Sequence, residues 1–266
     1  MKFPRQVCVA ALLWLCGVAA FAAEPATPKK PPANLHLYLL IGQSNMAGRG
    51  EIEDQDRQAH PRVLMFTKDN QWAPAVDPLH FDKPIAGVSL GSTFGRVMAD
   101  ADEGVTIGLI PCAVGGTPLK RWQKGGDLWK QAVARTQAAI KDGTLRGILW
   151  HQGESDSGDK ATAESYGQRL AEMVVDLRKE LDTPNVPFVA GKLGDFLAEK
   201  SKDGQPSYWK IVNKHIEALP QQVPHTAVAE SAGLKSKADK VHFDAATLRE
   251  FGRRYATVMQ QLQRAP

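Results

Sequence analysis

Short apolar runs alternate with helix-length amphipathic stretches over residues 34–266, and this alternation constrains the fold more than any other feature of the sequence. Residues 35–41 (LHLYLLI) and 146–150 (RGILW) have the nearly continuous apolar character of strands buried on both faces of a parallel sheet. The predicted strands are 35–41, 63–66, 105–110, 146–150, 186–190 and 226–230, and the predicted helices are 94–101, 128–141, 163–181, 209–219 and 245–262. Strands separated by helices predict one three-layer α/β/α domain with a parallel sheet.

The first 22 residues have the pattern of a secretory signal peptide. Lys2 and Arg5 precede an uncharged apolar run over residues 7–21, and residues 20–22 (AFA) supply the small-x-small pattern of a cleavage site. The run is about 15 residues long, short of the roughly 20 needed to span a bilayer, which disfavours the alternative of a membrane anchor. We therefore expect a secreted or periplasmic protein without stable membrane association after cleavage.

Residues 23–33 are rich in Pro and Lys and predict an extended linker, which leaves residues 34–266 as a single domain. Loss of the signal peptide would also remove Cys8 and Cys16, so that Cys112 alone remains. A single thiol cannot form an intrachain disulfide, and the domain must depend on its apolar core.

The charge of the chain argues against a nucleic-acid-binding protein. Its 33 basic and 29 acidic residues give a formal net charge of +4. That balance differs from the concentrated basic face that nucleic-acid binding normally requires. We therefore expect no nucleic-acid partner.

Polar, glycine-containing segments follow several predicted strands, at the sheet edge where α/β proteins bind ligands. Residues 42–48 (GQSNMAG) follow the first strand and place Ser44 at the start of a helix. There its backbone N–H lacks a helical acceptor and the helix dipole favours negative charge, which suits a nucleophile. The alternative is that Ser44 only caps the helix.

Two further segments could stabilise an oxyanion. In residues 111–118 (PCAVGGTP), the adjacent Gly115 and Gly116 allow a ligand to approach a backbone N–H closely, although an ordinary turn is the alternative. In residues 151–156 (HQGESD), the side-chain amide of Gln152 can donate to an oxyanion, and the alternative is a solvated polar loop.

An acid precedes a histidine by three residues near the end of the chain, as Asp239 and His242. A carboxylate so placed can contact the ring, fix its tautomer and stabilise the imidazolium formed when the other nitrogen takes a proton. An ordinary surface loop is the alternative. Cys112 is expected to be a packed residue rather than a nucleophile. Without clustered His and Asp ligands we expect no metal site and no metal-dependent phosphoesterase chemistry.

Taken in chain order, GQSNM, GGTP, WHQGESD and D-x-x-H-F resemble the motifs of the SGNH-type (GDSL-like) hydrolases. The resemblance is to the sialate O-acetylesterase-like branch, which includes carbohydrate esterase family 6 acetylxylan esterases. It covers nearly all of residues 35–262 and implies a flavodoxin-like α/β/α sandwich that hydrolyses esters without a metal or cofactor.

The resemblance also implies a role for each matched residue. Ser44 is the implied nucleophile, His242 the general base and then acid, and Asp239 the orienting carboxylate. The implied oxyanion hole consists of the N–H of Ser44, the N–H of Gly115 and the side chain of Gln152. Glu154 is a second candidate for the role of Asp239, and Gly116 is a second candidate for that of Gly115.

These features predict a secreted serine esterase that removes O-acetyl groups from carbohydrate through an acyl-enzyme on Ser44. The expected partner is an acetylated oligosaccharide or polysaccharide, such as acetylxylan or another acetylated glycan. The alternatives are sialate O-acetylesterase activity and a catalytically silent carbohydrate-binding protein on the same fold. A lipase or thioesterase is disfavoured because the sequence shows no obvious long apolar lid. Three tryptophans could stack on sugar rings or serve as packing: Trp72, Trp122 and Trp129.

Overall fold

The computed structural model describes residues 32–198 and 204–264. The predicted signal peptide and nearly all of the predicted linker lie outside these residues. Residues Pro31–Pro266 form one compact unit. Within the described ranges, no helix has the length and apolar character that crossing a membrane requires.

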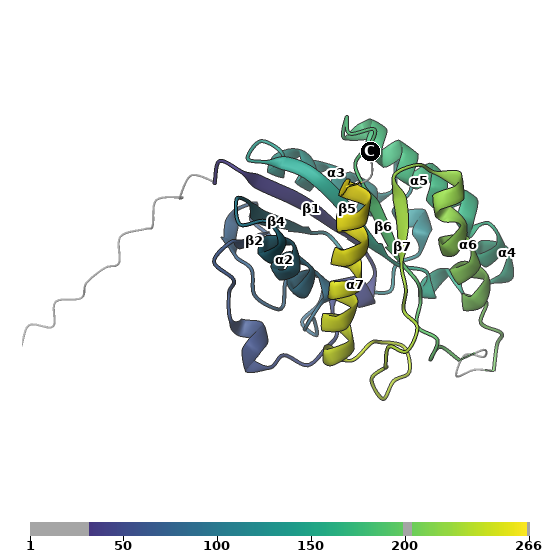
Figure 1. The fold of residues 1–266 in the computed structure, drawn as a ribbon. Coiled ribbons are helices and arrows are strands. Elements are labelled where there is room, and N and C mark those ends of the chain that lie inside the picture. Colours follow the sequence, from purple (N-terminus) through teal and green to yellow (C-terminus); the bar gives the residue numbers. More distant parts are fainter. Residues whose placement is uncertain (1–31, 199–203, 265–266) are drawn as a thin grey trace, which may run out of the picture. The chain divides into compact units, whose positions relative to one another are not determined.

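A seven-stranded sheet forms the centre of this unit, with the strand order β3-β2-β4-β1-β5-β6-β7 (Figure 1). All neighbouring strands pair in parallel except β2 and β3. The strands are β1 (Leu35–Gly42), β2 (Val63–Phe66), β3 (Trp72–Pro74), β4 (Thr106–Pro111), β5 (Thr144–His151), β6 (Phe188–Gly191) and β7 (Thr226–Ala229). The predicted α/β fold is confirmed, and each of the six predicted strands is present.

The short edge strand β3 was not predicted. It pairs antiparallel with β2 through three residue pairs, after a turn in which Asn70 has a positive φ of 58°. Three residues are too few to show a two-residue periodicity in the sequence. Trp72, in this strand, is partly buried and donates from its indole Nε1 to Asp142.

Helices cover both faces of the sheet (Figure 1). Their bounds are α1 (Ser44–Ala47), α2 (Leu90–Ala101), α3 (Asp127–Ala139), α4 (Lys160–Glu164), α5 (Tyr166–Glu180), α6 (Trp209–Gln222) and α7 (Ala245–Arg264), with 3-10 turns η1 (Asp54–Arg57), η2 (Leu119–Arg121) and η3 (Glu154–Asp156). The predicted helix over 163–181 is divided at Ser165, whose hydroxyl donates to the carbonyl of Ala161. Such bonding competes with regular helix geometry.

Successive residues of β1 contribute to two separate apolar cores, as a strand buried on both faces requires. Leu37 and Leu39 belong to the core under α3, α5 and α6, whereas Tyr38 and Leu40 belong to the core under α2 and α7. Trp122 and Trp129 are buried in the first of these cores, at 1% and 5% exposure. The packing interpretation therefore holds for both tryptophans.

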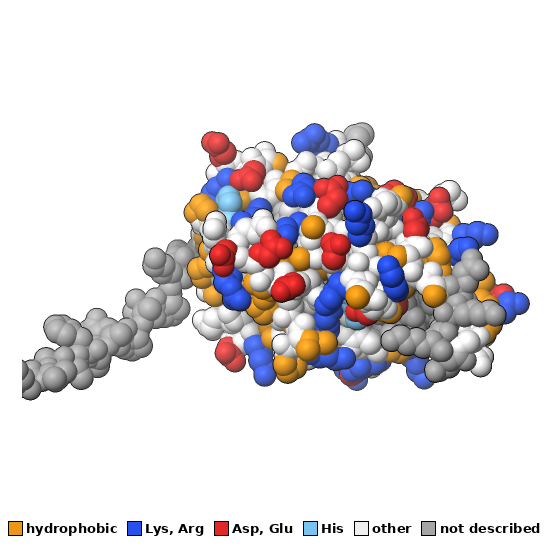
Figure 2. Space-filling model, turned by 90° about the horizontal axis from the view of Figure 1, so that it is seen from below, with side chains coloured by type: hydrophobic (Ala, Val, Ile, Leu, Met, Phe, Trp, Pro, Cys, Tyr) orange, Lys and Arg blue, Asp and Glu red, His pale blue; other side chains and the backbone are white. Residues whose placement is uncertain are grey.

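The sheet topology determines where the polar segments meet. The central strand β1 lies between β4 and β5, and all three run parallel. The segments that follow them therefore emerge at one edge of the sheet. The loop between β7 and α7 reaches the same edge, at the bottom of Figure 1. Figure 2 views this side of the molecule and shows basic and acidic side chains interspersed with apolar ones, in keeping with the balanced net charge.

Candidate active site

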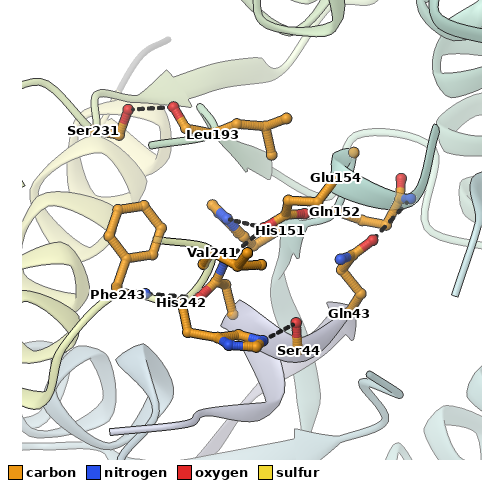
Figure 3. A network of polar contacts seen from close by, with 12 residues as sticks. Gln43, Ser44, His151, Gln152, Glu154, Leu193, Ser231, Val241, His242 and Phe243 are labelled. Carbon is orange, nitrogen blue, oxygen red and sulfur yellow. Dashed lines mark hydrogen bonds and ion pairs between the residues drawn. The ribbon is translucent and has the colours of Figure 1, made fainter. Parts of the chain in front are cut away.

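Ser44, His242 and Asp239 form a continuous chain of polar contacts. Ser44 Oγ lies 3.0 Å from His242 Nε2, and His242 Nδ1 lies 2.8 Å from Asp239 Oδ2. Figure 3 shows the imidazole directed at the serine hydroxyl. Ser44 follows directly after β1 at the start of α1, while the other two residues come from the β7–α7 loop. Ser44 and His242, which are 198 positions apart in sequence, are thus brought into hydrogen-bonding distance.

A local turn holds Asp239 against the ring of His242. The second oxygen of the carboxylate, Oδ1, accepts the backbone N–H groups of Val241 and His242, both at 2.9 Å. Burial raises the pKa of Asp239, but the hydrogen bonds from the backbone and ring of His242 outweigh it and hold the pKa at about 2. The carboxylate is therefore ionised at neutral pH and can stabilise an imidazolium.

Asn45 fixes the backbone on both sides of His242. Its amide Nδ2 donates to the carbonyl of Val241 at 3.2 Å, and its Oδ1 accepts the N–H of Phe243 at 3.1 Å. The sequence reasoning missed this residue. The only signal in the sequence was its position directly after Ser44. The structure shows that its polar side chain is buried, at 1% exposure.

Glu154 lies behind Asn45 and makes no recorded contact with His242 among the described residues. Its Oε1 accepts a hydrogen bond from Asn45 Nδ2 at 2.5 Å and lies 3.6 Å from Nε2 of the buried His151. Burial raises the pKa of Glu154, but His151 and Asn45 outweigh it and leave the pKa below its usual value. Of the two candidate acids, Asp239 is the one in contact with the ring of His242, because the local turn directs it there.

Gln152 is placed differently from the expectation that it donates to an oxyanion. Its side chain is fully buried, and Nε2 lies 2.7 Å from Asp156 Oδ2, 3.1 Å from the carbonyl of Thr117 and 3.2 Å from Gln43 Oε1. The hydroxyl of Tyr166 lies 2.7 Å from the backbone carbonyl of Gln152 and 3.2 Å from its Oε1. Because protein acceptors take both amide hydrogens, the structure shows Gln152 as a link between loops rather than as a free donor.

The N–H of Gly115 is also engaged, because it donates to Asp82 Oδ2 at 2.8 Å. In this structure the N–H of Gly115 thus has a protein acceptor, unlike the free donor that the sequence led us to expect. The next residue, Gly116, is exposed and has a φ of +77°, which favours glycine. Across the described residues, no acceptor is recorded for the N–H of Gly116 or of Ser44. Gly116, the second candidate, is therefore the glycine whose N–H is available to a substrate.

In the described part of the chain, no group of three or more His, Cys, Asp or Glu side chains is placed to hold a metal ion. Burial raises the pKa of the Cys112 thiol to about 11. A cavity of about 610 Å³ lies beside the triad, and its lining includes Glu154, Asp239 and Val241.

Comparison with known proteins connects this geometry to a family. A family model described as "Carbohydrate esterase, sialic acid-specific acetylesterase" matches residues 34–261. A protein of Arabidopsis thaliana named as a probable carbohydrate esterase is 31% identical over 241 residues, which span 82% of this chain and 87% of the relative.

Solved structures agree with the sequence comparisons. The crystal structure of an Arabidopsis thaliana protein superimposes with a TM-score of 0.76 at 27% identity, covering 85% of this chain and 98% of the other. NanS shares the fold with a TM-score of 0.66 at 17% identity, over 88% of this chain and 99% of its own. A carbohydrate acetylesterase from Xanthomonas citri shares it with a TM-score of 0.64 at 19% identity, over 86% of this chain and 56% of its own.

Proposed function

Because the chain belongs to the carbohydrate esterase family of sialic acid-specific acetylesterases, and is thus a carboxylic ester hydrolase, we propose that it removes O-acetyl groups from carbohydrate through an acyl-enzyme on Ser44. The observation that carries this proposal is the chain of contacts from Ser44 through His242 to Asp239, at 3.0 and 2.8 Å. These distances suit a nucleophile, a general base and an orienting carboxylate.

The proposed reaction has two steps. His242 takes the proton of Ser44 Oγ, the oxygen attacks the acetyl carbonyl, and the N–H groups of Ser44 and Gly116 stabilise the resulting oxyanion. His242 then donates its proton to the departing sugar hydroxyl, which leaves the acetyl group on Ser44. In the second step His242 activates a water molecule, which releases acetate and restores the serine.

Asp239 supports both steps without touching the substrate. Its contact with Nδ1 places a proton on that nitrogen and leaves Nε2 free to accept the proton of Ser44. Its ionised carboxylate then stabilises the imidazolium, consistent with its pKa of about 2.

We further propose that the substrate is an acetylated polysaccharide such as acetylxylan, or another acetylated glycan, and that the protein acts after secretion or in the periplasm. The signal-peptide pattern of residues 1–22 supports the location. A second candidate substrate is O-acetylated sialic acid, because the matching family model is described as sialic acid-specific.

The test is acetate release from acetylated xylan, an O-acetylated sialic acid and an aryl acetate, with wild type, Ser44→Ala and Ser165→Ala compared. Ser165 is an exposed serine between α4 and α5 and serves as the matched control. We expect activity in wild type and Ser165→Ala and its loss in folded Ser44→Ala. Equal turnover by Ser44→Ala would refute the mechanism, and activity on the sialic acid but not on xylan would select the second substrate. Folded wild-type protein that cleaves none of the three would favour the carbohydrate-binding alternative.

A further inference from the structure

A buried ion pair lies beside Ser44 and takes no part in the triad. Arg49, five residues after the serine, contacts Asp82 with its Nη2 2.6 Å from Oδ2, and the two side chains are only 4% and 0% exposed. Removing both charges from water is costly, and a buried pair such as this is often no more stabilising than apolar residues would be. Its presence beside a nucleophile therefore suggests a role other than stability.

The ion pair acts directly on the glycine segment after β4. Asp82 Oδ2, which contacts Arg49, also accepts the N–H of Gly115 at 2.8 Å. A side chain at position 115 would overlap the Arg49 guanidinium and would approach Ser44 Cβ to 3.4 Å. Gly115 is thus enclosed between the nucleophile and the ion pair, and its backbone orientation is set by Asp82.

The residues after Gly116 are fixed as well. The carbonyl of Thr117 accepts from Gln152, and the N–H of Leu119 donates to the buried carboxylate of Asp156 at 2.8 Å. Gly116 therefore lies between two anchored positions, and its own N–H has no recorded acceptor among the described residues. Asp82 supplies the anchor on one side, and Gln152 and Asp156 supply the anchor on the other.

Arg49 is also connected to the loop that carries the catalytic histidine. Lys237 donates from Nζ to the carbonyl of Arg49 at 2.8 Å and from its backbone N–H to the carbonyl of His242 at 2.7 Å. The segment around Arg49 consequently joins the nucleophile helix, the glycine segment and the histidine loop.

We propose that Asp82, held by Arg49, is a positioning residue for the oxyanion hole. By accepting the N–H of Gly115, it restricts rotation of the backbone there and presents the N–H of Gly116 to the oxyanion. The inference rests on the proposed function, because it assigns the oxyanion that forms during attack by Ser44. A donor that is fixed in advance pays no reorganisation cost during the reaction.

The test compares Asp82→Leu, which removes the acceptor, with Asp82→Asn, whose amide oxygen can still accept the N–H of Gly115. The matched control is Asp56→Leu. Asp56 is also a buried carboxylate paired with an arginine, Arg249, at 2.6 Å, but it has no recorded contact with the glycine segment in the described ranges. Two rates are measured: kcat with KM on an aryl acetate, and the rate at which an aryl phosphonate modifies Ser44, followed by peptide mass spectrometry.

We expect Asp82→Leu to lower kcat and the phosphonylation rate by about 10²-fold, the loss typical of one oxyanion donor, with KM changed far less. Asp82→Asn should recover most of the loss, and Asp56→Leu should keep the wild-type kcat even if its melting temperature falls. If Asp82→Leu fails to fold, Arg49→Met/Asp82→Leu removes both charges and avoids an unpaired buried one, and the same loss is expected.

Two results would overturn the inference. One is a folded Asp82→Leu or double variant that is phosphonylated at the wild-type rate. The other is an equal fall in kcat for Asp56→Leu, which would indicate a general structural effect. In both cases wild-type Ser44 is modified, so the proposed function stands. If wild-type Ser44 is not modified at all, the proposed function fails, and this inference fails with it.

Discussion

Replacing Asp239 by Asn tests the assignment of the triad acid. In the structure both carboxylate oxygens are used: Oδ1 accepts the backbone N–H groups of Val241 and His242, and Oδ2 contacts Nδ1 of His242. An asparagine can retain the backbone bonds through its single carbonyl oxygen, so the turn should persist. Its NH2 group would then face Nδ1 and require that nitrogen to be unprotonated.

That change reverses the tautomer of the neutral imidazole. With Nδ1 unprotonated, the proton resides on Nε2, which can no longer accept the proton of Ser44. The ionised carboxylate that stabilises the imidazolium is lost as well. By analogy with the same substitution in other Ser-His-Asp triads, kcat should fall by about 10³- to 10⁴-fold, with little change in stability.

Glu154→Gln is the matched comparison, because Glu154 is the other candidate acid and contacts Asn45, which in turn bonds the backbone of Val241 and Phe243 on either side of His242. The side-chain oxygen of the introduced glutamine can still accept the hydrogen bond from Asn45, so we expect a loss of kcat below about tenfold. The assay is steady-state hydrolysis of an aryl acetate at pH 7–8 by protein checked for folding. A folded Asp239→Asn that retains a tenth of the wild-type kcat, beside a Glu154→Gln that loses 10³-fold, would refute the assignment.

Three further predictions follow from the same contacts. Asn45→Ala should cost about 3 kcal/mol of unfolding free energy in urea titration, because it breaks three hydrogen bonds and leaves the buried N–H of Phe243 unpaired; a loss below about 1 kcal/mol would contradict this. The pKa of Asp239 is lowered from 3.8 to about 2, so its stabilising contribution is present above about pH 4 and lost as the pH falls toward 2. Wild type should therefore lose more stability than Asp239→Asn over that range, and parallel melting curves would argue otherwise. Cys112, buried with its thiol pKa raised to about 11, should resist iodoacetamide at pH 8 in the native protein and react once unfolded, as mass spectrometry can show.

The position of the site could be predicted from the sequence because it depends on general rules of α/β topology. The apolar runs identify β1, β4 and β5, and their parallel pairing brings the segments that contain Ser44, Gly116 and Glu154 to one edge. The contact between Asp239 and His242 was also predictable, because the two residues are three positions apart and a single turn joins them.

The oxyanion donors were harder to predict because a donor group is available only if no nearby acceptor takes it. The sequence shows that Gly115 and Gln152 carry suitable N–H groups, but not that Asp82 and Asp156 lie next to them. Asp156 lies only four residues after Gln152, but Asp82 approaches from a loop 33 residues away, whose path no local pattern specifies. The clamp made by Asn45 was missed for the same reason, since its partners are 196 and 198 residues away.

The most direct test of the central claim is to look for the acyl-enzyme on Ser44. Wild-type protein turning over an aryl acetate is quenched in acid and digested, and the peptide that contains Ser44 is examined by mass spectrometry. The account predicts one acetyl group on Ser44, absent from Ser44→Ala, together with loss of acetate release in that variant. Acetate release by Ser44→Ala at the wild-type rate would contradict it.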